Sequence, residues 1–397
     1  MDKVLSSFPV AHGMCTGCGA CADRCPGGAV SMKPDVEGFL YPVVDTEKCN
    51  RCGLCERTCP VLHRDCPRKP LAVYAAKAKD RSLRLKSSSG GMFSLLAKNV
   101  IAEGGIVYGA GWRKPEWTVC HRPAENEDDL EELRGSKYVQ SEMGNVYSAA
   151  ARQLAAGRKV LFCGTPCQIA GLRRFLGREY ENLIIVDIVC HGAASPLAWR
   201  KYLDRRVRDA RERRGPDAGT VARLSHRHKK YGWKRFSMSM EFSGGGTYCR
   251  DLRHDPFLRG FLANLYLRPS CHNCPARDLR SGSDITLGDY WRDSGATGGF
   301  DDDLGVSLVL VNTQKGACAF DGLRGQMDLL ASDLQDALRG NPVISVDVAC
   351  HPQRGRAFEL LSGDCDFDAE IERLLHRPLW RRIAGRVLKI TRRVLGG

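Results

Sequence analysis

The sequence predicts an α/β (α+β) core that follows a small cysteine-rich domain at the N-terminus. Eight of the 19 cysteines fall in two similar runs before residue 60, and strand-like and helix-like patterns alternate from about residue 72 onward. Hydrophobic residues make up 43% of the 397-residue chain, which suits two or three domains. We therefore expect an N-terminal domain over 1–63, a linker over 64–71, a core over 72–345 and an extension over 346–397.

The two cysteine runs share one spacing. They read CTGCGACADRCP and CNRCGLCERTCP, and each follows the pattern C-x2-C-x2-C-x3-C-P. Their cysteines are Cys15, Cys18, Cys21, Cys25, Cys49, Cys52, Cys55 and Cys59. This pattern resembles bacterial two-cluster ferredoxins over residues 10–62, in which the fourth cysteine of each run ligates the other cluster.

That arrangement predicts two [4Fe-4S] clusters. One is expected to bind Cys15, Cys18, Cys21 and Cys59, and the other Cys49, Cys52, Cys55 and Cys25. The alternative is a pair of zinc knuckles, but zinc needs four ligands per site and no x2-x2-x3-Pro repeat. The segment thus predicts an electron-transfer domain.

The rest of the chain alternates between strands and helices. Strands are expected at 71–77, 106–112, 159–164, 182–192, 223–229, 235–242, 283–291 and 306–313. Helices are expected at 90–105, 126–135, 166–177 and 195–215. The strands at 223–229 and 235–242 alternate like an antiparallel insertion, whereas the prolines of 64–71 favour a linker.

Four later cysteines form a candidate third site. Cys167 follows a strand on the first turn of a helix, Cys190 lies at the end of the next strand, and Cys271 and Cys274 form a C-x2-C pair. Ligands of open α/β sheets bind at those strand ends. The four thiols are expected to hold a third [4Fe-4S] cluster. The alternatives are zinc at the same four residues or a redox thiol at Cys167, while Cys163 is expected to pack inside its strand.

Two polar loops could bind a ligand. KSSSGGMF (86–93) opens a helix, where backbone N–H groups suit a phosphate, although an ordinary helix cap explains it equally well. GSKYVQS (135–141) offers one cation and several donors, and by itself favours a plain polar loop.

Seven ordered blocks carry a family resemblance over about residues 70–320. They are SSSGGMFSLLAKNVIAEGGIVYGAGW, GSKYVQS, LFCGTPCQIAGLRRFL, VDIVCHGAASPLAWRKYL, RHKKYGW, CHNCPARDLRSGSDITLGDYW and DDLGVSLVLVNTQKG. Together they resemble the family of coenzyme F420 hydrogenase/dehydrogenase beta subunits. The resemblance implies a flavin-binding oxidoreductase core with FAD and an iron–sulfur cluster, which exchanges hydride with the deazaflavin.

The resemblance also implies site residues and partners. The residues expected to touch FAD are Ser88, Ser89, Gly90, Gly91, Ser136, Lys137 and Tyr138. Weak catalytic candidates are His191, Arg227 and Asp289, each of which also suits a structural hydrogen bond. Expected partners are a redox carrier or a partner oxidoreductase subunit, and exopolysaccharide-pathway proteins such as a pyruvyl transferase. A relay subunit without flavin is the alternative.

The net charge and the first residues of the chain predict where the protein is located and what it binds. The opening MDKVLSSFPVAHGMC lacks the regions of a secretory signal, so a cytoplasmic protein is expected. The formal charge is +14, but half of the excess lies in 376–397, so nucleic acid is not expected as a partner. The segment LWRRIAGRVLKITRRVLGG predicts a basic amphipathic helix that contacts an anionic membrane at its inner face, packs on the protein's own body, or docks on an acidic partner.

Overall fold

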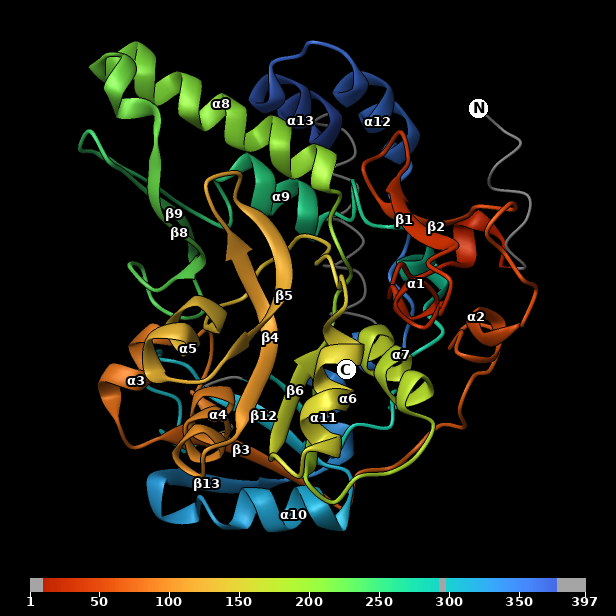
Figure 1. Cartoon of the computed structure of the whole chain (residues 1–397). Coiled ribbons are helices and arrows are strands. Elements are labelled where there is room, and N and C mark those ends of the chain that lie inside the picture. The colour runs from red at the N-terminus through yellow and green to blue at the C-terminus, as the bar shows by residue number, and fades with distance from the viewer. Residues whose placement is uncertain (1–9, 293–297, 377–397) are drawn as a thin grey trace, which may run out of the picture.

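An eight-stranded mixed sheet forms the centre of the computed structural model, which describes residues 10–292 and 298–376 (Figure 1). The strand order is β13-β3-β12-β11-β7-β6-β4-β5. The strands are β3 (Ala72–Ala78), β4 (Ile106–Arg113), β5 (Thr118–Ala124), β6 (Val160–Gly164), β7 (Leu183–Ile188), β11 (Ile285–Asp289), β12 (Ser307–Val311) and β13 (Met327–Ser332).

Four neighbouring strands of this sheet are parallel. β4 pairs with β6, β6 with β7, and β7 with β11, all in parallel, whereas the outer pairs are antiparallel. The C-terminal ends of β6, β7 and β11 therefore meet at one edge, which is where open α/β sheets bind ligands. The expected strand 182–192 is shorter, because β7 ends at Ile188 and leaves the following cysteine in a loop.

Helices cover both faces of the sheet. One face of β4, β6 and β7 packs with the helices α4 (Met92–Ala102), α5 (Glu127–Leu133) and α10 (Gln314–Asp321). The other face packs with α6 (Val146–Ala155) and α7 (Pro166–Leu176). Alternate residues of each strand point to opposite faces, so the apolar runs of these strands are buried on both sides. The remaining helices on this body are α3 (Arg81–Lys86) and α11 (Leu334–Gly340).

The expected antiparallel insertion is confirmed. It is a three-stranded sheet, β8 (Val221–His228), β9 (Ser237–Phe242) and β10 (Thr247–Asp251), in the order β10-β9-β8. It shares a large aromatic core with four helices (Figure 1). These are α8 (Pro196–Arg214), α9 (Pro256–Leu262), α12 (Arg354–Ser362) and α13 (Phe367–Leu375).

The N-terminal domain is small and packs directly on the core (Figure 1). It contains the hairpin β1 (Val30–Pro34) and β2 (Leu40–Val44) with two single-turn helices, α1 (Ala20–Asp23) and α2 (Leu54–Arg57). The Tyr147 hydroxyl on α6 donates to the carbonyl of Cys18 at 2.9 Å. The Gln140 amide oxygen accepts the Leu40 N–H at 3.1 Å, so the contact is polar as well as apolar.

Two sequence predictions concern the ends of the chain. The basic amphipathic helix falls within 377–397, outside the described residues. Among the described residues, no helix combines the length and apolar character that crossing a membrane requires.

Candidate functional site

Four of the N-terminal cysteines lie close together, and a fifth lies near a sixth. Cys18 and Cys21 are buried, and each lies close enough to Cys15 and Cys59 for those thiols to raise its pKa further, after the larger effect of burial. This grouping is the one that the motif predicts for the first cluster. On the other side, Cys25 lies near Cys55 and contributes to the raised pKa of its thiol, again after burial.

Two backbone N–H groups point at sulfur atoms of the N-terminal cysteines. The Gly17 N–H points to the Cys15 Sγ at 3.4 Å, and the Ala29 N–H points to the Cys25 Sγ at 3.2 Å. N–H groups aimed at sulfur stabilise negative charge on thiolates, which is the form that binds iron. The loops are thus shaped to hold charged sulfur.

The four later cysteines line one cavity at the ends of the parallel strands. The cavity has a volume of about 70 Å³, and its wall includes Cys167, Cys190, Cys271 and Cys274. Burial raises the pKa of the Cys271 and Cys274 thiols to about 11. Burial also raises the pKa of the Cys190 thiol, and the three other cysteines of the cavity raise it further. Buried thiols of this kind become thiolates only when a bound cation compensates their charge.

In the described part of the chain, no group of three or more His, Cys, Asp or Glu side chains converges closely enough to hold a single metal ion. The four thiols are instead spread over the wall of the cavity.

Local structure fixes the position of each cavity thiol. Thr165 precedes α7, and its N–H donates to the Gln168 Oε1 at 2.9 Å, which anchors the first turn that carries Cys167. A Cβ at Gly192 would lie 2.9 Å from Leu267, so only glycine lets the loop after β7 approach the 3₁₀ turn of Cys271. The Ala193 N–H of that loop points to the Cys271 Sγ at 3.4 Å.

Arg268 is a functional candidate that the sequence analysis missed. Its side chain is 1% exposed and lines the thiol cavity. Its guanidinium donates to the carbonyls of Cys15 at 2.8 Å and Leu40 at 3.0 Å, and to the Gln140 Oε1 at 3.2 Å. It also lies 4.0 Å from the ring centroid of Tyr41. Within residues 10–292 and 298–376, no carboxylate pairs with this cation.

Asp187 is a second residue that the sequence analysis missed. It lines the same cavity at 1% exposure and accepts hydrogen bonds from the hydroxyls of Ser281 at 2.6 Å and Ser283 at 2.8 Å. Burial raises its pKa. The available signal was a lone acid inside the apolar run LIIVDIV. Cys163 packs with the sheet core as expected, and burial raises the pKa of its thiol to about 12.

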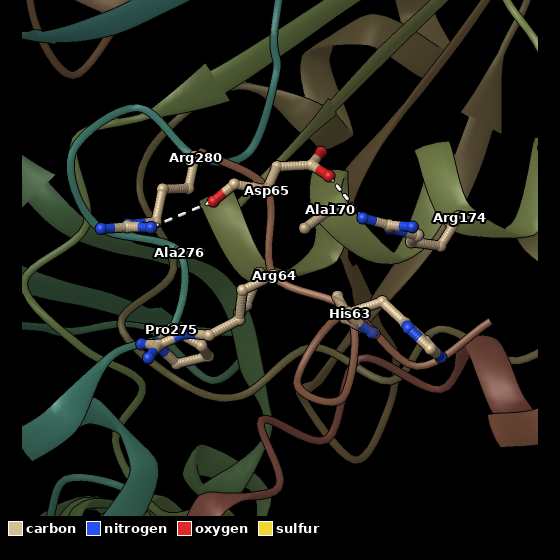
Figure 2. A pocket seen from close by; sticks show the side chains of 10 residues that line it. His63, Arg64, Asp65, Ala170, Arg174, Pro275, Ala276 and Arg280 are labelled. Carbon is tan, nitrogen blue, oxygen red and sulfur yellow. Dashed lines mark hydrogen bonds and ion pairs between the residues drawn. The ribbon is translucent and has the colours of Figure 1, made fainter. Parts of the chain in front are cut away.

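The expected linker runs along the outside of the cavity. Figure 2 shows Asp65 between Arg174 of α7 and Arg280: its carboxylate pairs with Arg174, and its carbonyl accepts from Arg280 at 3.1 Å. The same crevice also reaches Cys167 and leaves a volume of about 10 Å³, roughly one water molecule. Residues 64–70 contain no helix or strand but are held by these bonds.

The residues predicted to touch FAD come from two segments, 88–91 and 136–138, and both segments contact Arg227. The Ser136 N–H and the Ser136 hydroxyl both donate hydrogen bonds to the Ser88 Oγ, at 2.7 and 3.0 Å. Arg227 donates to the Tyr138 hydroxyl at 3.2 Å and to the Ser88 carbonyl at 3.3 Å. The Ser89 hydroxyl donates to the Val306 carbonyl at 2.8 Å, which ties the loop to the sheet.

The glycines of this loop serve close packing. A Cβ at Gly90 would lie 2.3 Å from the Ala76 carbonyl oxygen, so the loop can pass the sheet only as glycine. Gly91 has a φ of 93° and precedes α4, where a residue with a side chain would be strained. These two residues are therefore explained by the fold, whether or not a ligand binds.

Lys137 turns toward α5. Its ammonium donates to the carbonyls of Glu132, Leu133 and Arg134 at 3.0, 2.9 and 2.8 Å, which satisfies the C-terminal end of that helix. Burial lowers its pKa to about 7. In this structure its role is thus a helix cap.

The three weak catalytic candidates separate into two places. Arg227 and Asp289 form a buried ion pair, with 2.7 Å between Nη1 and Oδ2, and Asp289 also accepts from the Trp233 indole at 3.0 Å. His191 instead lines the thiol cavity, where its Nε2 lies 2.6 Å from the Asn264 Oδ1. Burial lowers the pKa of His191. The three candidates do not form one catalytic group.

The cysteine-rich domain and the matches to family models define an iron–sulfur protein of an oxidoreductase class. Residues 14–62 match the 4Fe-4S dicluster domain, residues 73–148 the N-terminal part of the coenzyme F420 hydrogenase/dehydrogenase beta subunit, and residues 157–337 its C terminus. The chain belongs to the family of coenzyme F420 hydrogenase/dehydrogenase beta subunits, with a ferredoxin-type dicluster domain at its N-terminus.

Two curated relatives are similar over part of the chain. An F(420)H(2) dehydrogenase subunit of Methanosarcina mazei is 27% identical over 193 residues, which is 46% of this chain and 54% of that protein. Coenzyme F420-dependent sulfite reductase of Methanocaldococcus jannaschii is 27% identical over 201 residues, 42% of this chain and 31% of that protein. The matches thus span about half or less of each relative.

A solved structure is also similar. It is a chain of the F420-reducing [NiFe] hydrogenase complex from Methanosarcina barkeri, with 19% identity and a TM-score of 0.44. The match covers 70% of this chain and 90% of that chain.

Proposed function

We propose that this chain is an iron–sulfur flavoprotein oxidoreductase that moves electrons between its N-terminal clusters and FAD through a third [4Fe-4S] cluster. Cys167, Cys190, Cys271 and Cys274 would hold that third cluster. The observation that carries the proposal is the buried Arg268, a cation with no carboxylate partner among the described residues. Such a burial is costly unless anionic groups lie beside it.

Anionic clusters on both sides of Arg268 would compensate its charge. The residue bonds to the Cys15 carbonyl on one side and lines the cavity of Cys167 and Cys271 on the other. It lowers the pKa of both of those cavity thiols, although burial raises them by more. A four-iron cluster with four thiolates carries net negative charge, which is the partner that this guanidinium lacks.

The contacts between the domains support an order for the electron path. A Cβ at Gly171 of α7 would lie 3.2 Å from the Cys18 Sγ, and the Tyr147 hydroxyl donates to the carbonyls of both Cys18 and Gln168. The first thiol set therefore lies against α7, the helix that carries Cys167 in its first turn. The set around Cys55 lies further out, so the proposed order is outer cluster, first cluster, third cluster.

One buried polar atom supports the proposal of a flavin in the core. The Arg227 Nε is buried without a hydrogen-bond partner among the described residues, next to the bonds of its other nitrogens to Tyr138 and Ser88. Ser88, Ser89, Ser136 and Tyr138 would contact the group with their backbone or hydroxyl atoms, and Arg227, whose charge is paired with Asp289, would donate a hydrogen bond from its Nε. When bound, a flavin accepts two electrons as hydride and releases them singly to clusters.

The substrate side of the proposal rests on the relatives. The names of both curated relatives contain coenzyme F420 or its reduced form, and we propose a deazaflavin of this kind as the hydride donor or acceptor. A partner oxidoreductase subunit or redox carrier would exchange electrons at the N-terminal domain. The expected exopolysaccharide role, pyruvyl-transferase partner and membrane contact stay predictions that no described residue supports.

Anaerobic purification with iron and flavin counted per chain tests the proposal. Three four-iron clusters give about twelve irons, and we expect one FAD beside them. Reduced coenzyme F420 should then bleach the flavin. About eight irons and no flavin after reconstitution would leave the alternative, a relay subunit without hydride chemistry. Zinc at the third site would give about eight irons with one zinc per chain.

A further inference from the structure

A basic groove lies at the opposite end of the aromatic core from the sheet. It runs between the C-terminal half of α8 and strand β10, has a volume of about 320 Å³, and shares no lining residue with the thiol cavity. Figure 1 shows α8 and α13 at that end of the molecule. We call it the arginine groove, because its lining includes Arg205, Arg206, Arg213, Arg214 and Arg250.

The acidic residues of the groove are already paired. Its carboxylates are Asp209 and Asp368. Arg206 lies 3.1 Å from Asp209 and also pairs with Asp368, and the Arg205 Nε lies 3.1 Å from Asp209. These two arginines and two acids cancel in charge, so any excess charge comes from the other residues of the wall.

Three guanidinium groups remain without an acid. Arg213, Arg214 and Arg250 are exposed and form no ion pair among the described residues. The first two end α8, where the helix dipole favours cations by itself. Arg250 comes from a separate element, strand β10, and lines the same groove. The three charges therefore converge from two elements, beyond what the helix end explains.

The floor of the groove holds a buried arginine that is paired with acids. Arg206 is 2% exposed, and its Nε has no hydrogen-bond partner among the described residues. The Tyr248 ring, another wall residue, lies 4.9 Å from its guanidinium carbon. Gly246 makes room for Arg214, since a Cβ there would lie 2.0 Å from the Arg214 Nη1. The groove thus combines a buried, acid-paired arginine, aromatic walls and three exposed arginines that form no ion pair among the described residues.

We propose that the arginine groove binds a small phosphorylated molecule that carries two phosphate groups. The planar guanidinium group of arginine donates two parallel hydrogen bonds to phosphate oxygens. Three guanidinium groups without an acid partner also match the charge of one diphosphate at neutral pH. The volume lies at the lower end of small-molecule sites, which suits a ligand smaller than a folded partner or a nucleic acid duplex. Such a site is separate from the proposed electron path.

Calorimetric titration of the anaerobic, cluster-loaded full chain with inorganic pyrophosphate tests this site. Wild-type protein should bind one pyrophosphate per chain, and Arg213→Gln and Arg250→Gln should each weaken binding about tenfold, the loss of one charge-assisted contact. Both residues are exposed, so the variants should keep the fold and the visible absorbance of the clusters.

Arg208→Gln is the matched control. Arg208 is exposed on the same helix but does not line the groove, so its removal should change affinity less than about twofold. Absence of saturable binding to wild type would overturn the proposal. So would an equal loss in all three variants, because that result shows diffuse attraction to a basic surface.

Discussion

Replacing Arg268 should make the neighbouring clusters harder to reduce. Arg268→Gln removes a buried positive charge, whereas Arg268→Lys keeps the charge and loses the planar fork. Reduction adds an electron to an already anionic cluster, and a nearby cation favours that step. The reduction potential of the third cluster, and of the cluster that includes Cys15, should therefore fall in the glutamine variant.

The size of the shift follows from Coulomb's law. Arg268 bonds to the backbone of one predicted ligand, Cys15, and lines the cavity of the others, so we take a separation of about 7 Å from cluster to charge. With an effective dielectric constant of about 20, the interaction is about 2.4 kcal/mol. For one electron this corresponds to roughly 100 mV. The lysine variant should retain more than half of the effect.

Redox titration followed by electron paramagnetic resonance measures these potentials. The control is Arg208→Gln, which removes an exposed charge of α8 and should leave every potential within about 20 mV. Iron content must equal that of wild type, since Arg268 also holds the backbone of the N-terminal domain. Unchanged potentials in Arg268→Gln with full iron content would refute the argument that this cation compensates the clusters.

Three further predictions concern single positions. Cys167→Ser should lower the iron content from about twelve to about eight atoms per chain. The control is Cys163→Ser, four residues away in a strand, which should leave the iron content unchanged. Equal losses of iron in both variants would contradict the assignment of Cys167 rather than Cys163 as a cluster ligand. Gly171→Ala should lower the free energy of unfolding by about 1–3 kcal/mol, because its Cβ would press on a thiol and a tyrosine hydroxyl at 3.2 Å. The control is Gly355→Ala in α12, where a Cβ would meet no atom within 4 Å, so it should be neutral or stabilise the chain by up to about 1 kcal/mol. Urea denaturation measures the free energy of unfolding of both variants. A similar change in both would contradict the packing argument for Gly171. Burial raises the pKa of Asp255 to about 6. Between about pH 4 and 6 the folded chain therefore keeps a proton on Asp255 that the unfolded chain has released. The free energy of unfolding should fall by about 2–3 kcal/mol as the pH rises through this range. Asp255→Asn should remove that slope in anaerobic urea denaturation at several pH values, and a slope identical to wild type would show that Asp255 does not cause it.

Periodicity and spacing predicted the main elements. The parallel strands β4, β6, β7 and β11 were predictable because they are buried on both faces and read as apolar runs bounded by turns. The strands β5, β10 and β13 were not expected, since they lie at sheet edges where half-exposed residues weaken the alternation. The cysteine runs were the strongest signal, because their spacing follows from the shape of a cluster loop.

The missing parts of the site depend on tertiary contacts. Arg268 opens the stretch RPSCHNC, and nothing in the neighbouring sequence shows that it reaches a carbonyl 253 residues earlier in the chain. Lys137 was expected to contact FAD because of the family resemblance, and in the fold its ammonium satisfies the end of α5. Asp187 was visible as an acid in an apolar strand and could have been selected on that ground.

Rapid freeze-quench electron paramagnetic resonance after mixing with reduced coenzyme F420 tests the central claim most directly. The comparison is between wild type and Cys274→Ser, a variant expected to lack the third cluster. The account predicts that flavin is reduced in both proteins, while the N-terminal clusters become reduced rapidly only in wild type. Equally fast reduction of those clusters in the variant would contradict the proposed path through the third cluster.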